Sequence, residues 1–418
     1  VARWLAENRA RSMAPLELDL AREPLVVLDL SVGSLALGAD PQAAGSEELA
    51  RSVAAECARI GARAALGRYD EVRLLYTAPL FAGARANDER RTLHVGLDLF
   101  VPAGSVVRAP LAGRVHALAN QPAAQDYGGV VVLEHATDAG ERFFTLYGHL
   151  APAALAALAA GQPLAAGASF ARVGTYAENG GWAPHLHFQL LLDDLGRGAD
   201  QPGVARASER TLATSLFPDP NLLLGIPEER FPPREPAKEE LLAERRARIV
   251  PNVRLAHRPD PLDVRRGWRT QLYDADGRAY LDVYNNVPLV GHSHPRVVAA
   301  AQRQLALLNT NTRYLHPDLA RYAERLCAHL PPELSVCAVV NSGSEANELA
   351  LRLARAHTRT DDVIVLAHAY HGHTTTLIDV SPYKFDGPGG SGRKPWVHVT
   401  PLPDDYRGRY RRDDRKCP

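Results

Sequence analysis

The feature that most constrains the fold is a change of pattern near residue 250. Between residues 70 and 225 apolar and polar residues alternate in short segments, which glycine and proline turns separate. This period is typical of β-strands, because successive side chains point to opposite faces of a sheet. We therefore predict an all-β domain with strands at residues 91–100, 129–135, 141–147 and 185–191.

Beyond residue 250 strand and helix patterns alternate, which favours a parallel α/β sheet. Residues 269–284 are typical of a hairpin with an Asp-Gly turn at 276–277. The remaining patterns predict helices at 295–308 and 317–330, a strand at 335–340 that leads into a helix, and a strand at 363–366.

The 418 residues are too many for one ordinary domain. We predict a multidomain chain, divided into a segment of unknown role (1–65), the β domain (66–227), a linker with a helix (228–250) and a partial α/β domain (251–418). Residues 1–65 contain no motif that points to a chemistry.

Composition argues against several classes of partner. The 48 basic and 48 acidic side chains cancel, so the chain has no electrostatic footprint for nucleic acid. No apolar run reaches the length of about 18 residues that a membrane helix needs. Four cysteines without a CxxC motif favour a reducing compartment. Together with the lack of a visible signal peptide, this pattern predicts a cytoplasmic protein, although a start at Val1 suggests a trimmed N-terminus.

Two segments of the β domain carry side chains that can bind a metal ion. On one strand, His94 and Asp98 would share a face, and Gly96 between them would leave room for the ion. On another strand, His185 and His187 would share a face in the same way. Imidazole nitrogen and carboxylate oxygen suit zinc, and three protein ligands leave a fourth position for water.

Further passages in the same order complete a family pattern. They are Val101-Pro102-Ala103-Gly104, Tyr127-Gly128-Gly129 and Tyr147-Gly148-His149-Leu150. With them, residues 66–227 resemble the lysostaphin/LytM-type zinc peptidases, a family of hydrolases that cut peptide bonds.

The resemblance implies a role for each of five side chains. His94, Asp98 and His187 would be the zinc ligands, and His149 and His185 would be the catalytic pair that orients water and stabilises the oxyanion. Some family members have lost ligands and serve as binding modules, but all five positions are kept here. The implied substrate is a peptide or a small amine-containing molecule.

The C-terminal domain carries a different pattern. Residues 341–347, Asn-Ser-Gly-Ser-Glu-Ala-Asn, join the predicted strand to a helix. Small residues let backbone N–H groups approach a phosphate there, and the helix N-terminus adds donors and a favourable dipole. Tyr370 follows the next strand, where an aromatic ring can stack on a flat cofactor.

Residues 240–410 resemble class III pyridoxal-phosphate aminotransferases, most closely the ethanolamine-phosphate and phospho-hydroxylysine phospho-lyases. The passages that carry the resemblance are 277–287, Gly291-His292-Ser293-His294-Pro295 and Ser381-Pro382-Tyr383-Lys384-Phe385. It implies a fold-type I transferase domain, with Gly343 and Ser344 on the cofactor phosphate and Tyr370 over the pyridine ring. His371 would be a further cofactor-binding residue. It also implies a homodimer in the intact protein.

One requirement of that family is not met by any recognisable motif. These enzymes need a Schiff-base lysine and an acidic partner for the pyridinium nitrogen, both further along the family's chain. None of the four lysines stands in such a setting. We therefore expect a fragment of a longer fusion, with a complete metallopeptidase domain and an incomplete pyridoxal-phosphate domain. The alternative is a fragment of a class III aminotransferase or lyase whose peptidase-like domain only binds.

Overall fold

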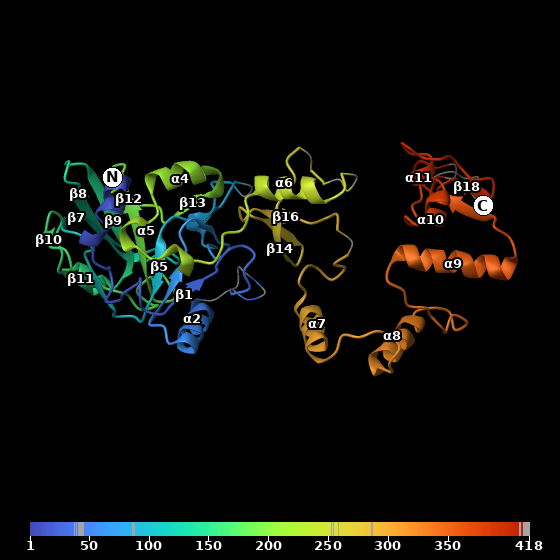
Figure 1. The fold of residues 1–418 in the computed structure, drawn as a ribbon, viewed down its shortest axis with the longest axis horizontal. Helices are drawn as coiled ribbons and strands as arrows, with labels where there is room; N and C mark the ends of the chain where they lie inside the picture. The colour runs from blue at the N-terminus through green and yellow to red at the C-terminus, as the bar shows by residue number, and fades with distance from the viewer. Residues whose placement is uncertain are drawn as a thin grey trace. The chain divides into compact units, whose positions relative to one another are not determined.

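The computed structural model describes residues 1–412 apart from 37, 39, 41–45, 86, 87, 252, 254, 258, 286, 409 and 410 (Figure 1). Cys417 and Lys416 lie outside the described residues. Backbone contacts divide the chain into two compact units, Val1–Leu307 and Leu308–Pro418. The division falls after helix α7 (Pro295–Leu307), whereas the sequence patterns place the domain boundary near residue 250.

The first unit is built on one large sheet. Among the described residues it has eight strands, in the spatial order β1 (Leu25–Leu28), β2 (Ala64–Gly67), β5 (Leu97–Phe100), β12 (His185–Leu191), β9 (Arg142–Leu150), β8 (Gly128–Ala136), β7 (Gly113–Gln121) and β10 (Pro163–Leu164). β1 and β2 run parallel, and all other neighbours run antiparallel.

The centre of this sheet is buried on both faces. Along β8, Val131 and Leu133 belong to one apolar cluster, whereas Val130 and Val132 belong to another. A strand covered on both faces has no polar face, which explains the near-continuous apolar run in this part of the sequence. The two clusters cover the middle strands on both faces, and these strands carry most of the candidate site.

Small sheets flank the large one. A three-stranded sheet has the order β13 (Val204–Arg206), β4 (Arg91–His94) and β3 (Glu71–Val72), and β11 (Ser169–Arg172) pairs with β6 (Val106–Arg108). The strand predicted at 91–100 is therefore wrong as a single element. It breaks at Val95 and Gly96, so that His94 lies in the small sheet and Asp98 in the large one.

Helices in this unit are mostly short. They are α1 (Ala2–Glu7), α2 (Ser46–Ile60), α3 (Pro152–Leu155), α4 (Arg210–Leu216), α5 (Asn221–Leu224), α6 (Lys238–Arg248) and α7, with 3-10 turns at Arg9–Arg11, Pro79–Phe81, Ala207–Glu209 and Glu228–Arg230. Because residues 66–227 also contain α3, α4 and α5, that region is rich in β-structure without being purely β.

The predicted hairpin is part of the first unit as well. It forms a three-stranded sheet of β14 (Val264–Trp268), β15 (Gln271–Asp274) and β16 (Ala279–Leu281), and Gly277 takes a φ of +75° in its turn. A positive φ costs glycine little, which agrees with the Asp-Gly turn signal.

The second unit contains α8 (Pro317–Cys327), α9 (Gly343–Thr358), β17 (Val363–Leu366), α10 (Thr375–Asp379), α11 (Pro382–Phe385) and β18 (Val397–Thr400). β17 and β18 pair in parallel, as the alternation of strands and helices predicts. The strand predicted at 335–340 does not form, and Val336 and Val339 are exposed. An isolated extended segment leaves its backbone groups without ladder partners, so propensity alone does not make a strand. No helix in the described parts of the chain has the length and apolar character to cross a bilayer.

Candidate metal centre

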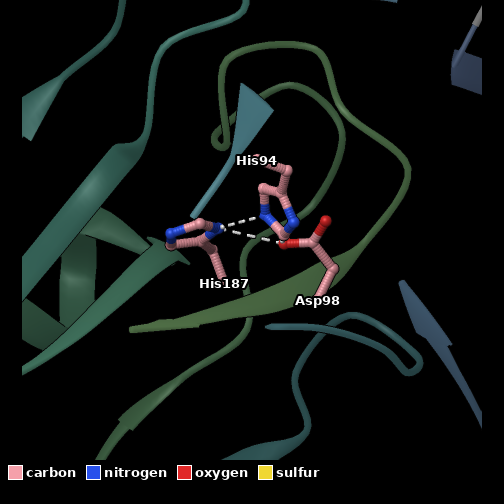
Figure 2. A group of neighbouring side chains, drawn as sticks. All are labelled: His94, Asp98 and His187. Atoms are coloured by element: carbon pink, nitrogen blue, oxygen red, sulfur yellow. Dashed lines mark hydrogen bonds and ion pairs between the residues drawn. The ribbon is translucent and has the colours of Figure 1, made fainter. Parts of the chain in front are cut away.

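Three buried side chains from three strands meet at one point (Figure 2). His94 ends β4, Asp98 lies in β5, and His187 lies in β12 directly opposite Asp98 in the strand register. His94 Nε2 lies 3.1 Å from His187 Nδ1 and 3.1 Å from Asp98 Oδ1, and His187 Nδ1 lies 3.0 Å from the same oxygen. The three atoms thus form a nearly equilateral triangle.

Hydrogen bonds on the outer side of each imidazole set its tautomer. Nδ1 of His94 lies 2.8 Å from the carbonyl oxygen of Arg68, which can only accept, so this nitrogen carries the proton and donates it. Nε2 of His187 lies 3.0 Å from Oε1 of Gln189, which also accepts. The lone pairs of His94 Nε2 and His187 Nδ1 therefore face each other and Asp98.

Such a donor set fits a cation. Two imidazole lone pairs and a carboxylate oxygen within hydrogen-bond distance repel one another unless a positive charge lies among them, and zinc takes these ligand types. Burial lowers the pKa of His94 to about 4, so its ring stays neutral near pH 7. Burial alone would raise the pKa of Asp98, but the neighbouring His94 and Arg73 hold it well below its usual range.

Gly96 serves a different purpose from the one the sequence suggested. A Cβ atom at this position would lie 2.5 Å from Cε1 of His187 and 2.7 Å from its Nε2. The space beside Gly96 is therefore filled by the imidazole ring of a ligand, and the expectation that it leaves room for an ion is wrong. The physical reason is that the strand is interrupted at Gly96, where the missing side chain lets β12 approach the backbone closely.

Arg73 is a part of the candidate site that the sequence pattern does not indicate. Its guanidinium is 2% exposed and contacts Oδ2 of Asp98 at 2.6 Å and Oε2 of Glu71 at 2.8 Å. It also donates to the carbonyl oxygen of Arg68 at 3.0 Å. Asp98 is thus held by Arg73 through one oxygen while the other faces the two histidines. An arginine among other charged residues gave no signal that it would be buried.

His149 and His185 lie beside the triangle, with their ring centroids 4.2 Å apart. Nδ1 of His149 donates to the carbonyl oxygen of Asn179 at 3.1 Å, and Nδ1 of His185 donates to that of Ala183 at 2.7 Å. Each ring therefore keeps an unprotonated Nε2. Burial lowers the pKa of both, and the neighbouring His185 and His187 lower that of His149 further.

His149 also has a backbone φ of +64°, in the left-handed region that a β-strand residue rarely adopts. Such strain persists only where the surroundings enforce it, and it is concentrated at functional sites.

The three candidate ligands and the two further histidines, His149 and His185, all line a single cleft. Three further buried groups in its wall have a polar atom without a partner in the described structure: the hydroxyl of Tyr127, Nε1 of Trp182 and Oε1 of Gln201. Buried polar atoms are normally satisfied, so three unpartnered ones in the wall of a single cleft point to a partner that binds there, such as water or a polar ligand. Sequence patterns gave no reason to single out Trp182 or Gln201.

The residues expected to bind pyridoxal phosphate lie in the second unit. Gly343 and Ser344 begin α9, whose N-cap Ser342 accepts a hydrogen bond from the Glu345 N–H. A side-chain amide of α9, from Asn347, donates to the carbonyl oxygen of His371 at 2.8 Å, which ties the helix to the segment after β17.

Tyr370 is 52% exposed, with Nζ of Lys384 5.5 Å from its ring centroid. Nε2 of His371 is buried without a partner in the described structure. The structure thus brings the α9 N-terminus and the 370–373 segment together. Among the described residues it places one lysine, Lys384, against the tyrosine ring.

Comparison with known families gives each domain a match. Residues 92–197 match the model of Peptidase family M23, and residues 254–417 match that of Aminotransferase class-III. The chain therefore carries one segment that matches each family model. Both resemblances drawn from the sequence are confirmed at this level, and the chain joins a peptidase-type domain to an aminotransferase-type domain.

Two similar proteins carry the names of an aminotransferase and of a phospho-lyase. An alanine–glyoxylate aminotransferase 2-like protein of Drosophila melanogaster is 49% identical over 174 residues, which are 42% of this chain and 35% of that protein. Ethanolamine-phosphate phospho-lyase homolog 1 of Caenorhabditis elegans is 44% identical over 180 residues, 43% of this chain and 38% of its own. The chain therefore spans well under half the length of these relatives.

Among solved structures, a phospholyase from Arthrobacter in complex with phosphoethanolamine is 42% identical. The match covers 39% of this chain and 38% of that one, with a TM-score of 0.36.

Proposed function

We propose that residues 66–227 are a zinc-dependent endopeptidase domain with His94, Asp98 and His187 as its ligands. The observation that carries the proposal is the arrangement of lone pairs. Two buried imidazoles are fixed by outer hydrogen bonds so that their unprotonated nitrogens face one carboxylate oxygen. Outer partners of this kind orient zinc-binding histidines in metalloenzymes.

One of the two histidines beside the ligands would transfer the proton of the attacking water. When bound, zinc supplies Lewis acidity that polarises a peptide carbonyl and makes water a nucleophile near neutral pH. The unprotonated Nε2 of His149 or His185 would take a proton from the attacking water as the new C–O bond forms. The C–N bond then breaks, and the same proton is returned to the departing amine. During the attack the other imidazole would hold the carbonyl oxygen in its protonated form, in which Nε2 also carries a proton that it can donate.

Substrate binding would use the unpartnered groups of the cleft wall after a side-chain movement that uncovers their buried polar atoms. Tyr127 and Trp182 can donate hydrogen bonds to peptide carbonyl oxygens, and Oε1 of Gln201 can accept one from a peptide N–H. A peptide offers both kinds of partner at regular spacing. The proposed substrate class is therefore a peptide that lies extended along the cleft.

Zinc content and hydrolysis test the proposal together. We expect about one zinc per chain in the parent and a loss of zinc in His187→Ala, because two ligands are too few for a tight site. His116→Ala is the matched control, since this histidine pairs with Asp194 away from the triangle. His149→Gln should keep zinc but lose cleavage of a fluorogenic peptide library, typically by a factor of about 10²–10⁴.

Absence of zinc from the supplemented parent would refute the peptidase mechanism and favour the alternative, in which the domain only binds. Zinc retained in His187→Ala would instead show that the ligand assignment is wrong.

We also propose that the second unit carries part of a pyridoxal-phosphate site. Gly343 has open space where a side chain would stand, so the first turn of α9 can admit a phosphate oxygen. Ser344, Tyr370 and His371 would complete the phosphate and ring contacts. Transaminase or lyase activity is proposed only for a longer, intact protein, in which the cofactor site would be shared across a homodimer.

A further inference from the structure

The three-stranded hairpin sheet β14–β16 lies within the segment that matches the aminotransferase family, yet its side chains pack into the peptidase-type domain. Trp268 and Tyr273 are buried in the same apolar cluster as Val72, Leu74 and Leu93. The last three belong to β3, the residues after it, and β4. The hairpin therefore shares a hydrophobic core with the small sheet that carries His94.

Polar contacts fix the same docking. Oγ1 of Thr92, two residues before His94, donates to the carbonyl oxygen of Asp276 at 2.9 Å. At the hairpin turn, a Cβ atom on Gly277 would lie 3.2 Å from a methyl carbon of Thr92 and 3.2 Å from one of Val72. The turn thus lies in direct contact with the small sheet, and glycine permits this approach.

A third contact comes from the other end of the hairpin. The guanidinium of Arg266 donates to the carbonyl oxygens of Ser34 and Gly38, the latter at 2.6 Å. Buried apolar side chains, a turn contact and a charged donor thus hold the sheet at separate points. Contacts spread in this way resist rotation of one element on another, which a single contact would permit.

We infer that residues 264–281 pack on the peptidase-type domain as part of its cooperative folding unit and stabilise the strand that bears His94. The segment that matches the aminotransferase family is then not structurally independent of the peptidase-type domain, because its first strands pack on that domain. Opening of the hairpin exposes Val72, Leu74 and Leu93 and loosens β3 and β4 together. This packing requires neither bound zinc nor hydrolytic activity.

Hydrogen exchange on the full chain, followed by mass spectrometry, tests the inference without any variant. Cooperative units of a protein exchange their protected amides together. Peptides from 268–275 and from 91–94 should therefore show similar protection in the parent. A hairpin that exchanges freely while β4 stays protected would overturn the inference.

Variants supply a second, directional test. Trp268→Ala should speed exchange in 71–76 and 91–94 by about tenfold or more, because it removes a buried side chain that spans the interface. Leu281→Ala is the matched control, since Leu281 lies on the same hairpin and is 62% exposed. Should Trp268→Ala fail to fold, Thr92→Val removes only the hydrogen bond to Asp276 and should give a smaller increase in the same peptides. Acceleration confined to the hairpin itself, with β4 unchanged in both variants, would overturn the inference.

Discussion

Replacing Arg73 by methionine should strongly destabilise the zinc-free domain. The guanidinium is almost wholly buried and pairs with Asp98 and Glu71 at 2.6 and 2.8 Å. Glu71 keeps a second partner, Arg68, at 2.6 Å. Asp98 has no other arginine or lysine among the described residues, so the substitution would leave one buried carboxylate without its cation.

The loss in free energy of unfolding follows from the number of buried carboxylates that lose their cation. Removing one partner of a buried ion pair costs about 3–5 kcal/mol, and because Glu71 stays paired we expect the lower end, about 3 kcal/mol. Zinc should reduce the loss, because bound metal would again give Asp98 a positive neighbour. The variant is therefore expected to gain more stability from zinc than the parent does.

The assay is urea unfolding followed by near-ultraviolet circular dichroism, with and without zinc. Arg210→Met is the matched control, because Arg210 pairs with Asp70 at 2.8 Å while 46% of its side chain is exposed. A pair of that kind is worth about 1 kcal/mol or less. If Arg73→Met were no more harmful than Arg210→Met, the assigned role of Arg73 as the partner that holds Asp98 would be refuted.

Two further outcomes are expected. Without zinc, stability should fall from pH 6.5 downward: burial lowers the pKa of His94 to about 4 and lowers that of His149, whereas unfolded histidine titrates near about 6.5, so acid favours the unfolded state. A urea midpoint that stays constant between pH 7 and pH 5 would contradict this. Pyridoxal phosphate should bind the full chain in equilibrium dialysis and bind Ser344→Asp less, because a carboxylate at the α9 N-terminus repels phosphate. Equal binding by Ser344→Asp and a Ser215→Asp control would count against the proposed cofactor site.

Regular local patterns were readable from the sequence. The strand at His185–Leu191, the hairpin turn at Gly277 and the helices that begin at Pro295 and Pro317 lie where periodicity and turn residues place them. The His/Asp spacing, together with the short motifs around it, was enough to indicate the peptidase family. These features depend on neighbours in sequence, which the chain itself specifies.

Non-local contacts were not readable. Gly96 was expected to make room for an ion, but which ring fills the space beside it depends on β12, about ninety residues away. The strand predicted at 335–340 failed for a related reason, since extended backbone needs a partner strand that local propensity cannot supply.

The sequence by itself therefore determined which side chains could act as ligands and which families the two segments resemble, because those properties belong to residue types and their order. Only the tertiary structure decided that Arg73 lies buried against Asp98, that outer carbonyl and amide groups fix the histidine tautomers, and that the 264–281 hairpin packs on the small sheet. Each of these depends on burial and on partners distant in the chain, where loss of water makes an ion pair or a hydrogen bond decisive.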